Sequence, residues 1–114
     1  MKGIAEDYYK ALGKKDIHLV KTFLHPEIVF SDPQESVSGK DNVLDAAERF
    51  SHIFTSMDVR SVFEKEDEAA VIYNVNISGL KNPLKAVSHL SFKDGLISKI
   101  ELFYDMSGFK SVRS

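Results

Sequence analysis

The sequence predicts an α+β domain in which three N-terminal helices pack on a curved, mostly antiparallel sheet and form a cone. Apolar residues in the first half of the chain recur at helical spacing, whereas the second half changes to the two-residue alternation of strands. Short separators rich in Gly, Asn, Asp and Pro divide that second half, which indicates an antiparallel meander. Because helices and strands are segregated along the chain, α+β is favoured over α/β.

The first two helices are predicted from short apolar stripes and boundary signals. The first covers residues 3–13 and ends at Gly13, and Tyr9 lies off its stripe, so we expect Tyr9 at the surface or at the edge of the packed face. Asp16 can cap a second helix, which His25-Pro26 ends because the residue before proline avoids the α region. The two inward stripes comprise Ile4, Tyr8, Ala11 and Leu12, then Ile17, Val20, Phe23 and Leu24.

A short strand and a third helix follow. The strand, residues 27–31, is apolar and stops at Ser31-Asp32-Pro33, so a carboxylate stands where a buried strand ends. Ser38, with Asp41 three positions later, resembles a capping box and predicts the start of a helix over roughly 40–55. The buried stripe of this helix comprises Val43, Leu44, Ala47, Phe50, Ile53 and Phe54.

Four strands are predicted over residues 57–65, 69–78, 84–93 and 96–105. Alternate residues of a strand share one face. The inward face of the last three comprises Val71, Tyr73, Val75, Ile77, Leu84, Ala86, Ser88, Leu90, Phe92, Ser98, Ile100, Leu102 and Tyr104. The outward face carries Ile72, Val87, His89 and Phe103 among polar neighbours. An apolar patch on an uncovered sheet face predicts a binding partner.

Composition excludes several functional classes. Residues 1–114 make one domain, because 114 residues are too few for two cores. The formal net charge of −2 gives no electrostatic basis for binding nucleic acid. The absence of cysteine fits a reducing cytoplasm, and a cytoplasmic location is expected because no signal peptide is visible. No apolar run approaches the ~18–20 residues of a membrane span, so no membrane association is expected.

The chain shows no pattern for a metal or a cofactor. Its four histidines are far apart, without the spacing of a metal-binding motif, and His25 is expected to finish a helix. Gly39 is isolated, so no glycine-rich phosphate loop exists. We therefore expect neither a metal nor a cofactor.

Three stretches resemble the nuclear transport factor 2-like superfamily, which includes SnoaL-like polyketide cyclases and ketosteroid isomerases. They are DYYKALGKKDIHLVKTFLHPEIVFSDP, VSGKDNVLDAAERF and HLSFKDGLISKIELFYD, and the similarity extends over residues 3–106. The resemblance implies a cystatin-like cone with a pocket between the helices and the sheet. It does not by itself define a function, because the fold hosts enzymes, binders and oligomerisation modules.

The resemblance to ketosteroid isomerase implies catalytic roles for two residues. Asp32, in the Asp-Pro turn, corresponds to the general base of that family, and Tyr8 corresponds to its oxyanion-binding tyrosine. Ser88 stands where the family places a protonated acid, so the chain departs from the pattern there. The residues alone leave open that Asp32 only closes a turn and that Tyr8 is only a core aromatic.

The predicted ligand is a small apolar or aromatic molecule. Few polar groups in an apolar wall are typical of a small-molecule site, although a packed core has the same composition. The expected ligand-binding residues are Phe50, Phe54, Tyr73, Ser88, Leu90, Leu102 and Tyr104. The expected activity is cofactor-free proton transfer, of isomerase or cyclase type. The alternative is a non-catalytic ligand-binding or dimerisation module with a filled or inert pocket. Because relatives commonly dimerise through the outer sheet face, a homodimer is expected.

Overall fold

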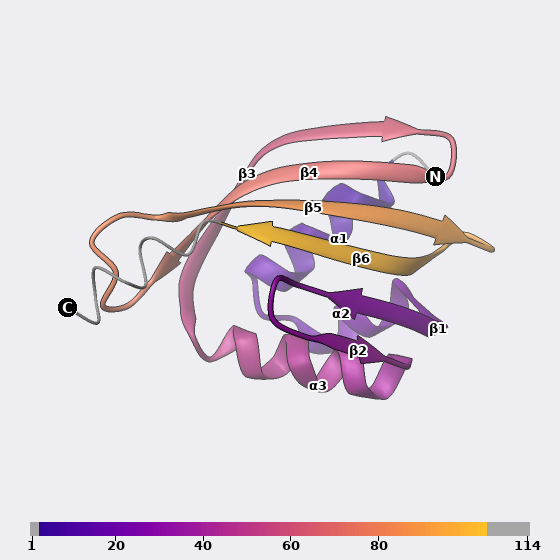
Figure 1. Cartoon of the computed structure of the whole chain (residues 1–114), viewed down its shortest axis with the longest axis horizontal. Helices are drawn as coiled ribbons and strands as arrows, with labels where there is room; N and C mark the ends of the chain where they lie inside the picture. The colour runs from indigo at the N-terminus through magenta and orange to yellow at the C-terminus, as the bar shows by residue number, and fades with distance from the viewer. Residues whose placement is uncertain (1–2, 105–114) are drawn as a thin grey trace.

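The structure, a computed structural model, describes residues 3–104 and confirms the α+β class. Its helices are α1 (Ile4–Gly13), α2 (Ile17–Thr22) and α3 (Lys40–Ser51). Its strands are β1 (Leu24–Ser31), β2 (Ser36–Ser38), β3 (Phe54–Lys65), β4 (Glu68–Ile77), β5 (Leu84–Lys93) and β6 (Leu96–Tyr104). The helices gather on one side of the sheet and leave its other face uncovered (Figure 1). Among residues 3–104, none of the helices has the length and hydropathy of a membrane-spanning segment.

The six strands form one sheet in the order β2-β1-β6-β5-β4-β3. All neighbours pair antiparallel except β1 and β6, which pair parallel, so the expected mostly antiparallel sheet is confirmed. Register shifts interrupt β3 twice, between Phe54 and Ser56 and between Val59 and Ser61. Such irregularities bend a strand and increase its twist. The sheet therefore curves around the helices (Figure 1).

The concave face of the sheet carries the core. Alternate residues of β4 and β5 are buried, as the strand alternation predicted. In β6, Ile97 and Ile100 are both buried although they are three residues apart, because a register shift lies between Ser91 and Phe92 on the paired strand β5. Two-residue alternation therefore predicts the buried face of a regularly paired strand, but the prediction fails across a bulge.

The boundary between α2 and β1 lies earlier than predicted. The helix ends at Thr22, and β1 begins at Leu24, so His25 lies in a strand and does not finish a helix. Two contacts with β6 explain the change: Leu24 pairs with Ile97, and the amide of Ile97 donates to the carbonyl of Phe23 at 2.8 Å. The proline at position 26 is compatible with this strand, because the residue before a proline favours extended backbone.

The prediction that Ser38 caps the third helix is wrong. Ser38 belongs to β2, a strand that was not predicted, and pairs with Val29 of β1. Gly39 takes the N-cap position with φ 93°, and α3 has no side-chain cap. The amide of Gly39 donates to the carbonyl of Ile28 at 2.8 Å, so pairing with β1 determines the backbone conformation at Gly39. A positive φ is accessible to glycine because it has no Cβ.

The third helix is also shorter than predicted. It ends at Ser51, and β3 begins at Phe54, where pairing with Ile77 of β4 replaces the helix. At the other end of the chain, the last residue of the predicted strand 96–105 lies outside the described residues.

Candidate functional site

A cavity of about 330 Å³ lies between the helices and the concave face of the sheet. Its wall is mostly apolar, and all four tyrosines of the chain contribute to it. The aromatic members are Tyr8, Tyr9, Phe30, Phe50, Tyr73 and Tyr104, and the charged members are Asp32, Glu35 and Arg49. This volume is at the low end of the ~300–1,000 Å³ that is usual for small-molecule sites. The cavity therefore suits a small ligand with an apolar body.

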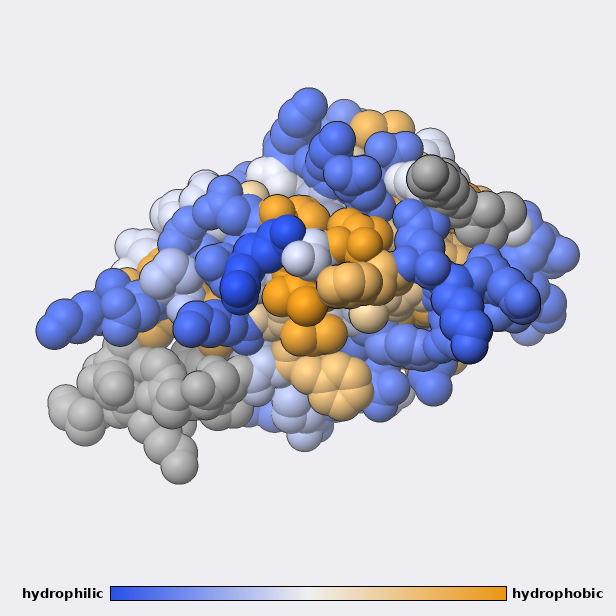
Figure 2. Space-filling view, turned by 90° about the horizontal axis from the view of Figure 1, so that it is seen from above, coloured by the Kyte–Doolittle hydropathy of each residue, from blue (hydrophilic) through white to orange (hydrophobic). Residues whose placement is uncertain are grey.

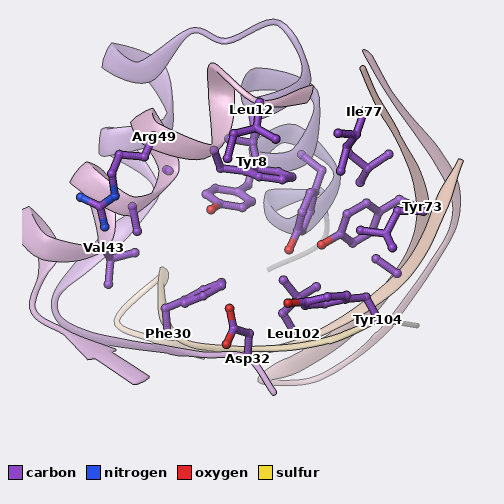
Figure 3. Close-up of a pocket in the computed structure, with 18 of the residues that line it drawn as sticks. Tyr8, Leu12, Phe30, Asp32, Val43, Arg49, Tyr73, Ile77, Leu102 and Tyr104 are labelled. Carbon is purple, nitrogen blue, oxygen red and sulfur yellow. The ribbon is translucent and has the colours of Figure 1, made fainter. Parts of the chain in front are cut away.

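Asp32 lies on the cavity wall directly after β1, and its carboxylate is held by the backbone. Its Oδ1 accepts hydrogen bonds from the amides of Gln34 and Glu35, both at 2.8 Å. The amide of Asp32 donates to the carbonyl of Glu35 at 2.9 Å, which closes the turn. These bonds leave Oδ2 without a hydrogen-bond partner among residues 3–104. Asp32 therefore closes a turn and also presents a carboxylate to the cavity (Figure 3).

Tyr8 presents a buried hydroxyl to the same cavity. Only 4% of its surface is exposed, and its ring packs edge-on against Tyr9 and Phe23. Burial raises the pKa of Tyr8, and neighbouring Tyr73 adds to the effect, so the phenol stays protonated and can donate. In the described part of the chain this hydroxyl makes no hydrogen bond. Because this hydroxyl is not among the fully buried unpartnered atoms of the described residues, it is open to the cavity, where a ligand acceptor could bind it.

A second group of hydroxyls lies deeper along the sheet. The Tyr73 hydroxyl and Ser88 Oγ are 2.9 Å apart. The Tyr9 hydroxyl interacts with both, and its ring lies 4.8 Å from that of Tyr73. Burial is the main reason why the pKa values of Tyr9 and Tyr73 are raised. These phenols satisfy one another, which distinguishes them from Tyr8.

Tyr104 completes the wall at the end of β6. It is half-buried, and Figure 3 shows it pointing into the space that Asp32 and Tyr73 face. Burial raises the pKa of Tyr104, and the negative charges of Asp32 and Glu35 add to the effect. Tyr104 is thus a neutral phenol beside two carboxylates.

The structure brings six of the nine residues proposed from the sequence to one cavity. Those that line it are Tyr8, Asp32, Phe50, Tyr73, Leu102 and Tyr104. Phe54, Ser88 and Leu90 do not line it. Phe54 packs against the ring of Phe50 at 4.9 Å and lies in the core. Ser88 is fully buried behind Tyr73, and Leu90 is fully buried farther along β5, opposite Ala69 and Ile100.

The sequence did not predict five of the lining residues: Tyr9, Phe30, Glu35, Ala46 and Arg49. Tyr9 was expected at the surface or at the edge of the packed face, yet only 3% of it is exposed. A signal for Tyr9 existed, because residues 5, 8, 9 and 12 have the i, i+3, i+4, i+7 spacing of a buried helix face. Arg49 had no such signal, since a charged residue on an amphipathic helix normally marks the solvent face.

The described residues include no group of three His, Asp or Glu side chains that could hold a metal ion. The polar atoms of the cavity are phenols, carboxylates and one guanidinium. Such a set can orient a ligand, accept a proton at Asp32 and donate hydrogen bonds from Tyr8.

Known proteins share this architecture. A family model described as the SnoaL-like domain matches residues 5–100. A protein structure from Kribbella flavida is similar at a TM-score of 0.88 and 24% identity, covering 96% of this chain and 90% of that one. A candidate ketosteroid isomerase from the same organism has a TM-score of 0.79 and 22% identity, covering 91% and 76%. A cystatin-like protein from Silicibacter pomeroyi has a TM-score of 0.85 and 16% identity, covering 99% and 82%. No curated protein matches the chain.

Proposed function

Because this chain belongs to the SnoaL-like domain family of the nuclear transport factor 2-like superfamily, we propose that it binds a small apolar or aromatic molecule in its cavity. The observation that carries the proposal is the unpartnered Tyr8 hydroxyl, which faces the same space as the Asp32 carboxylate. A filled core would have buried that hydroxyl against an acceptor. The ligand is expected to supply a carbonyl or comparable acceptor to Tyr8.

The chemistry that this arrangement supports best is proton transfer without a cofactor. In our proposal, Asp32 removes a proton from the carbon beside a ligand carbonyl, and the electron pair moves to the carbonyl oxygen. Tyr8 then donates a hydrogen bond to the resulting enolate. Return of the proton from Asp32 to a different carbon gives isomerisation. Attack of the enolate carbon on a second carbonyl gives an aldol-type cyclisation, after which the proton goes to the new alkoxide.

A second candidate function is binding without catalysis. Two observations favour it: the turn hydrogen bonds already use Asp32 Oδ1, and Ser88 is absent from the cavity wall. The cavity therefore lacks the second acid of the isomerases at the matching position. If the protein binds without catalysis, the apolar wall determines the affinity for the ligand, and Asp32 only maintains the turn.

Filling the cavity should abolish ligand binding. Ala47 of α3 lies on the wall and is 9% exposed, so the larger side chain in Ala47→Phe is directed into the space that a ligand would use. We expect wild type to bind 2-naphthamide, a neutral aromatic amide, and Ala47→Phe to bind it about tenfold or more weakly, roughly 1.4 kcal/mol. Titration followed by naphthalene fluorescence measures both affinities.

Thermal unfolding provides the control, because overpacking alone can cost about 1–3 kcal/mol. An Ala47→Phe protein that has the melting temperature of wild type and no longer binds 2-naphthamide supports the cavity as the binding site. Unchanged affinity in a folded Ala47→Phe protein would place the ligand elsewhere.

We also propose that the uncovered sheet face joins two copies of this chain. Ile72, Val87 and Phe103 occupy one row across β4, β5 and β6, and Phe63 of β3 adds to them. Phe103 is 50% exposed and Phe63 61%. Figure 2 shows a group of apolar side chains on the side seen from above, with hydrophilic residues around it. Burial against an identical row would remove these rings from water.

A homodimer is therefore expected at micromolar protein concentration. Phe103→Glu and Val87→Glu should each convert it to a monomer, because a carboxylate would be desolvated at the centre of the interface. Light scattering coupled to size exclusion measures the mass. Lys99→Glu on the same face of β6, outside the apolar row, is the matched charge control. A monomeric wild type, or a dimer that tolerates both changes, would contradict the proposal.

A further inference from the structure

We propose that Arg49 binds an anionic group of the ligand, so that the ligand is an apolar or aromatic carboxylate. This inference rests on the proposed ligand cavity and adds the chemical class of the molecule that occupies it. It concerns a residue of α3 that lies beside Val43 at the edge of the cavity, away from Asp32 (Figure 3).

Arg49 is the sole cationic side chain on the described cavity wall. Its guanidinium has no hydrogen-bond or ion-pair partner within residues 3–104. Two lysines of the helical layer, by contrast, have partners: Lys10 lies 3.8 Å from Glu6, and Lys15 donates to the carbonyl of Phe54 at 2.7 Å. Arg49 thus combines a free charge with a place at a ligand-sized space.

The polar and charged groups of the cavity wall come from different elements. Helix α3 supplies the Arg49 guanidinium, α1 supplies the protonated Tyr8 hydroxyl, and Tyr104 of β6 adds a phenol beside the carboxylates. The segment between β1 and β2 supplies the acceptors, Asp32 and Glu35. A ligand fits this division when its acceptor groups face the helices and its C–H or donor groups face Asp32. A carboxylate with a nearby carbonyl has that pattern.

The chemistry of arginine selects a carboxylate among possible acceptors. Its planar guanidinium presents paired N–H groups that match the two oxygens of a carboxylate. Because Arg49 is exposed, the pair would form at the mouth of the cavity, with the apolar body of the ligand deeper inside. Solvent at the mouth weakens the attraction, so a moderate gain in affinity is expected.

The two carboxylates of the cavity do not cancel this effect. Asp32 Oδ1 is already bound by two backbone amides, and Glu35 is exposed to water. In Figure 3 Asp32 stands beside Phe30, whereas Arg49 stands beside Val43. A ligand carboxylate held at Arg49 would therefore lie apart from Asp32.

Three probes with one aromatic body and different charges test the proposal: 2-naphthoate, 2-naphthamide and 2-naphthylmethylammonium. We expect wild type to bind the naphthoate most tightly. Arg49→Gln should lower the affinity for naphthoate about five- to tenfold and leave the affinity for the neutral naphthamide unchanged. Added salt should reduce naphthoate affinity in wild type more than in Arg49→Gln, because ions screen an exposed charge pair.

Arg60→Gln is the matched control, because Arg60 is an exposed arginine of β3 that lies outside this cavity. It should leave all three affinities unchanged. Equal binding of naphthoate and naphthamide, a naphthoate affinity that Arg49→Gln does not change, or a preference for the ammonium probe would each overturn the role of Arg49. Binding of the amide in those cases would leave the proposed ligand cavity intact. Failure of all three probes to bind would overturn both proposals.

Discussion

Asp32→Asn is expected to lower the rate of proton transfer about 10²–10⁴-fold, because an amide cannot act as the general base. The substituted side chain keeps an Oδ1 atom, which can still accept the amides of Gln34 and Glu35. The turn and the affinity for neutral ligands should therefore change little. Loss of rate with retained affinity is the behaviour of a group that acts in the transition state.

The measurement is proton exchange and isomerisation of a panel of β,γ-unsaturated ketones and polyketide-like diketones, followed by nuclear magnetic resonance in deuterated water. Glu35→Gln is the matched control, since it removes a neighbouring carboxylate of the same wall and leaves Asp32 in place. Tyr8→Phe should show a smaller loss than Asp32→Asn, because Tyr104 remains on the same wall and can donate to the enolate.

The outcome separates the enzyme from the binder. Turnover by wild type that Asp32→Asn loses supports Asp32 as the base. A wild type that binds naphthamide and turns over no member of the panel would favour binding without catalysis. If Asp32→Asn still turns over the substrate, another group must remove the proton. If Asp32→Asn only lowers the melting temperature, the role of Asp32 is limited to closing the turn.

Phe54→Ala is expected to lower the free energy of unfolding by about 3–5 kcal/mol. Phe54 is 1% exposed, packs against Phe50 and lies under the ammonium of Lys15, which is 4.8 Å from its ring centroid. Its removal creates a cavity and leaves that ammonium over empty space. Such a loss is a large part of the ~5–15 kcal/mol that stabilises an ordinary domain.

Denaturant unfolding measures this loss, and Phe50→Ala is the matched comparison. Phe50 is half-buried and lines the ligand cavity, so its truncation should cost less stability and more ligand affinity than that of Phe54. If Phe54→Ala were nearly as stable as wild type but failed to bind naphthamide, Phe54 would belong to the ligand site after all.

Much of the fold could be predicted from local pattern. The change of apolar period from helical to alternating is visible in the sequence because a helix and a strand bury different spacings of one chain. Short turn signals separated β3, β4, β5 and β6 with errors of a few residues. The position of Asp32 at the end of β1 was also visible, as an apolar run that stops at Asp-Pro.

Less of the site could be predicted, because alternation gives the face of a strand but not the depth along it. Tyr73, Ser88 and Leu90 all point to the concave side, yet only Tyr73 reaches the cavity. Ser88 is fully buried with its Oγ 2.9 Å from the Tyr73 hydroxyl, and Leu90 is fully buried in the core. Whether an inward residue meets a ligand depends on how closely the helices approach that part of the sheet.

The sequence by itself determined the fold class, the inward faces of the regular strands and the place of Asp32, since each depends on neighbouring residues. Only the tertiary structure decided four other features: β2 in place of a Ser38 cap, the early start of β1, the burial of Tyr9 and the position of Arg49 at the cavity. The first three depend on pairing or packing with another element. Val29 pairs with Ser38, Ile97 with Leu24, and the Tyr9 ring packs on Tyr73. The fourth depends on where α3 lies relative to the sheet. Backbone groups and rings adopt the arrangement that satisfies them in the whole molecule, and local propensity yields where such partners are available.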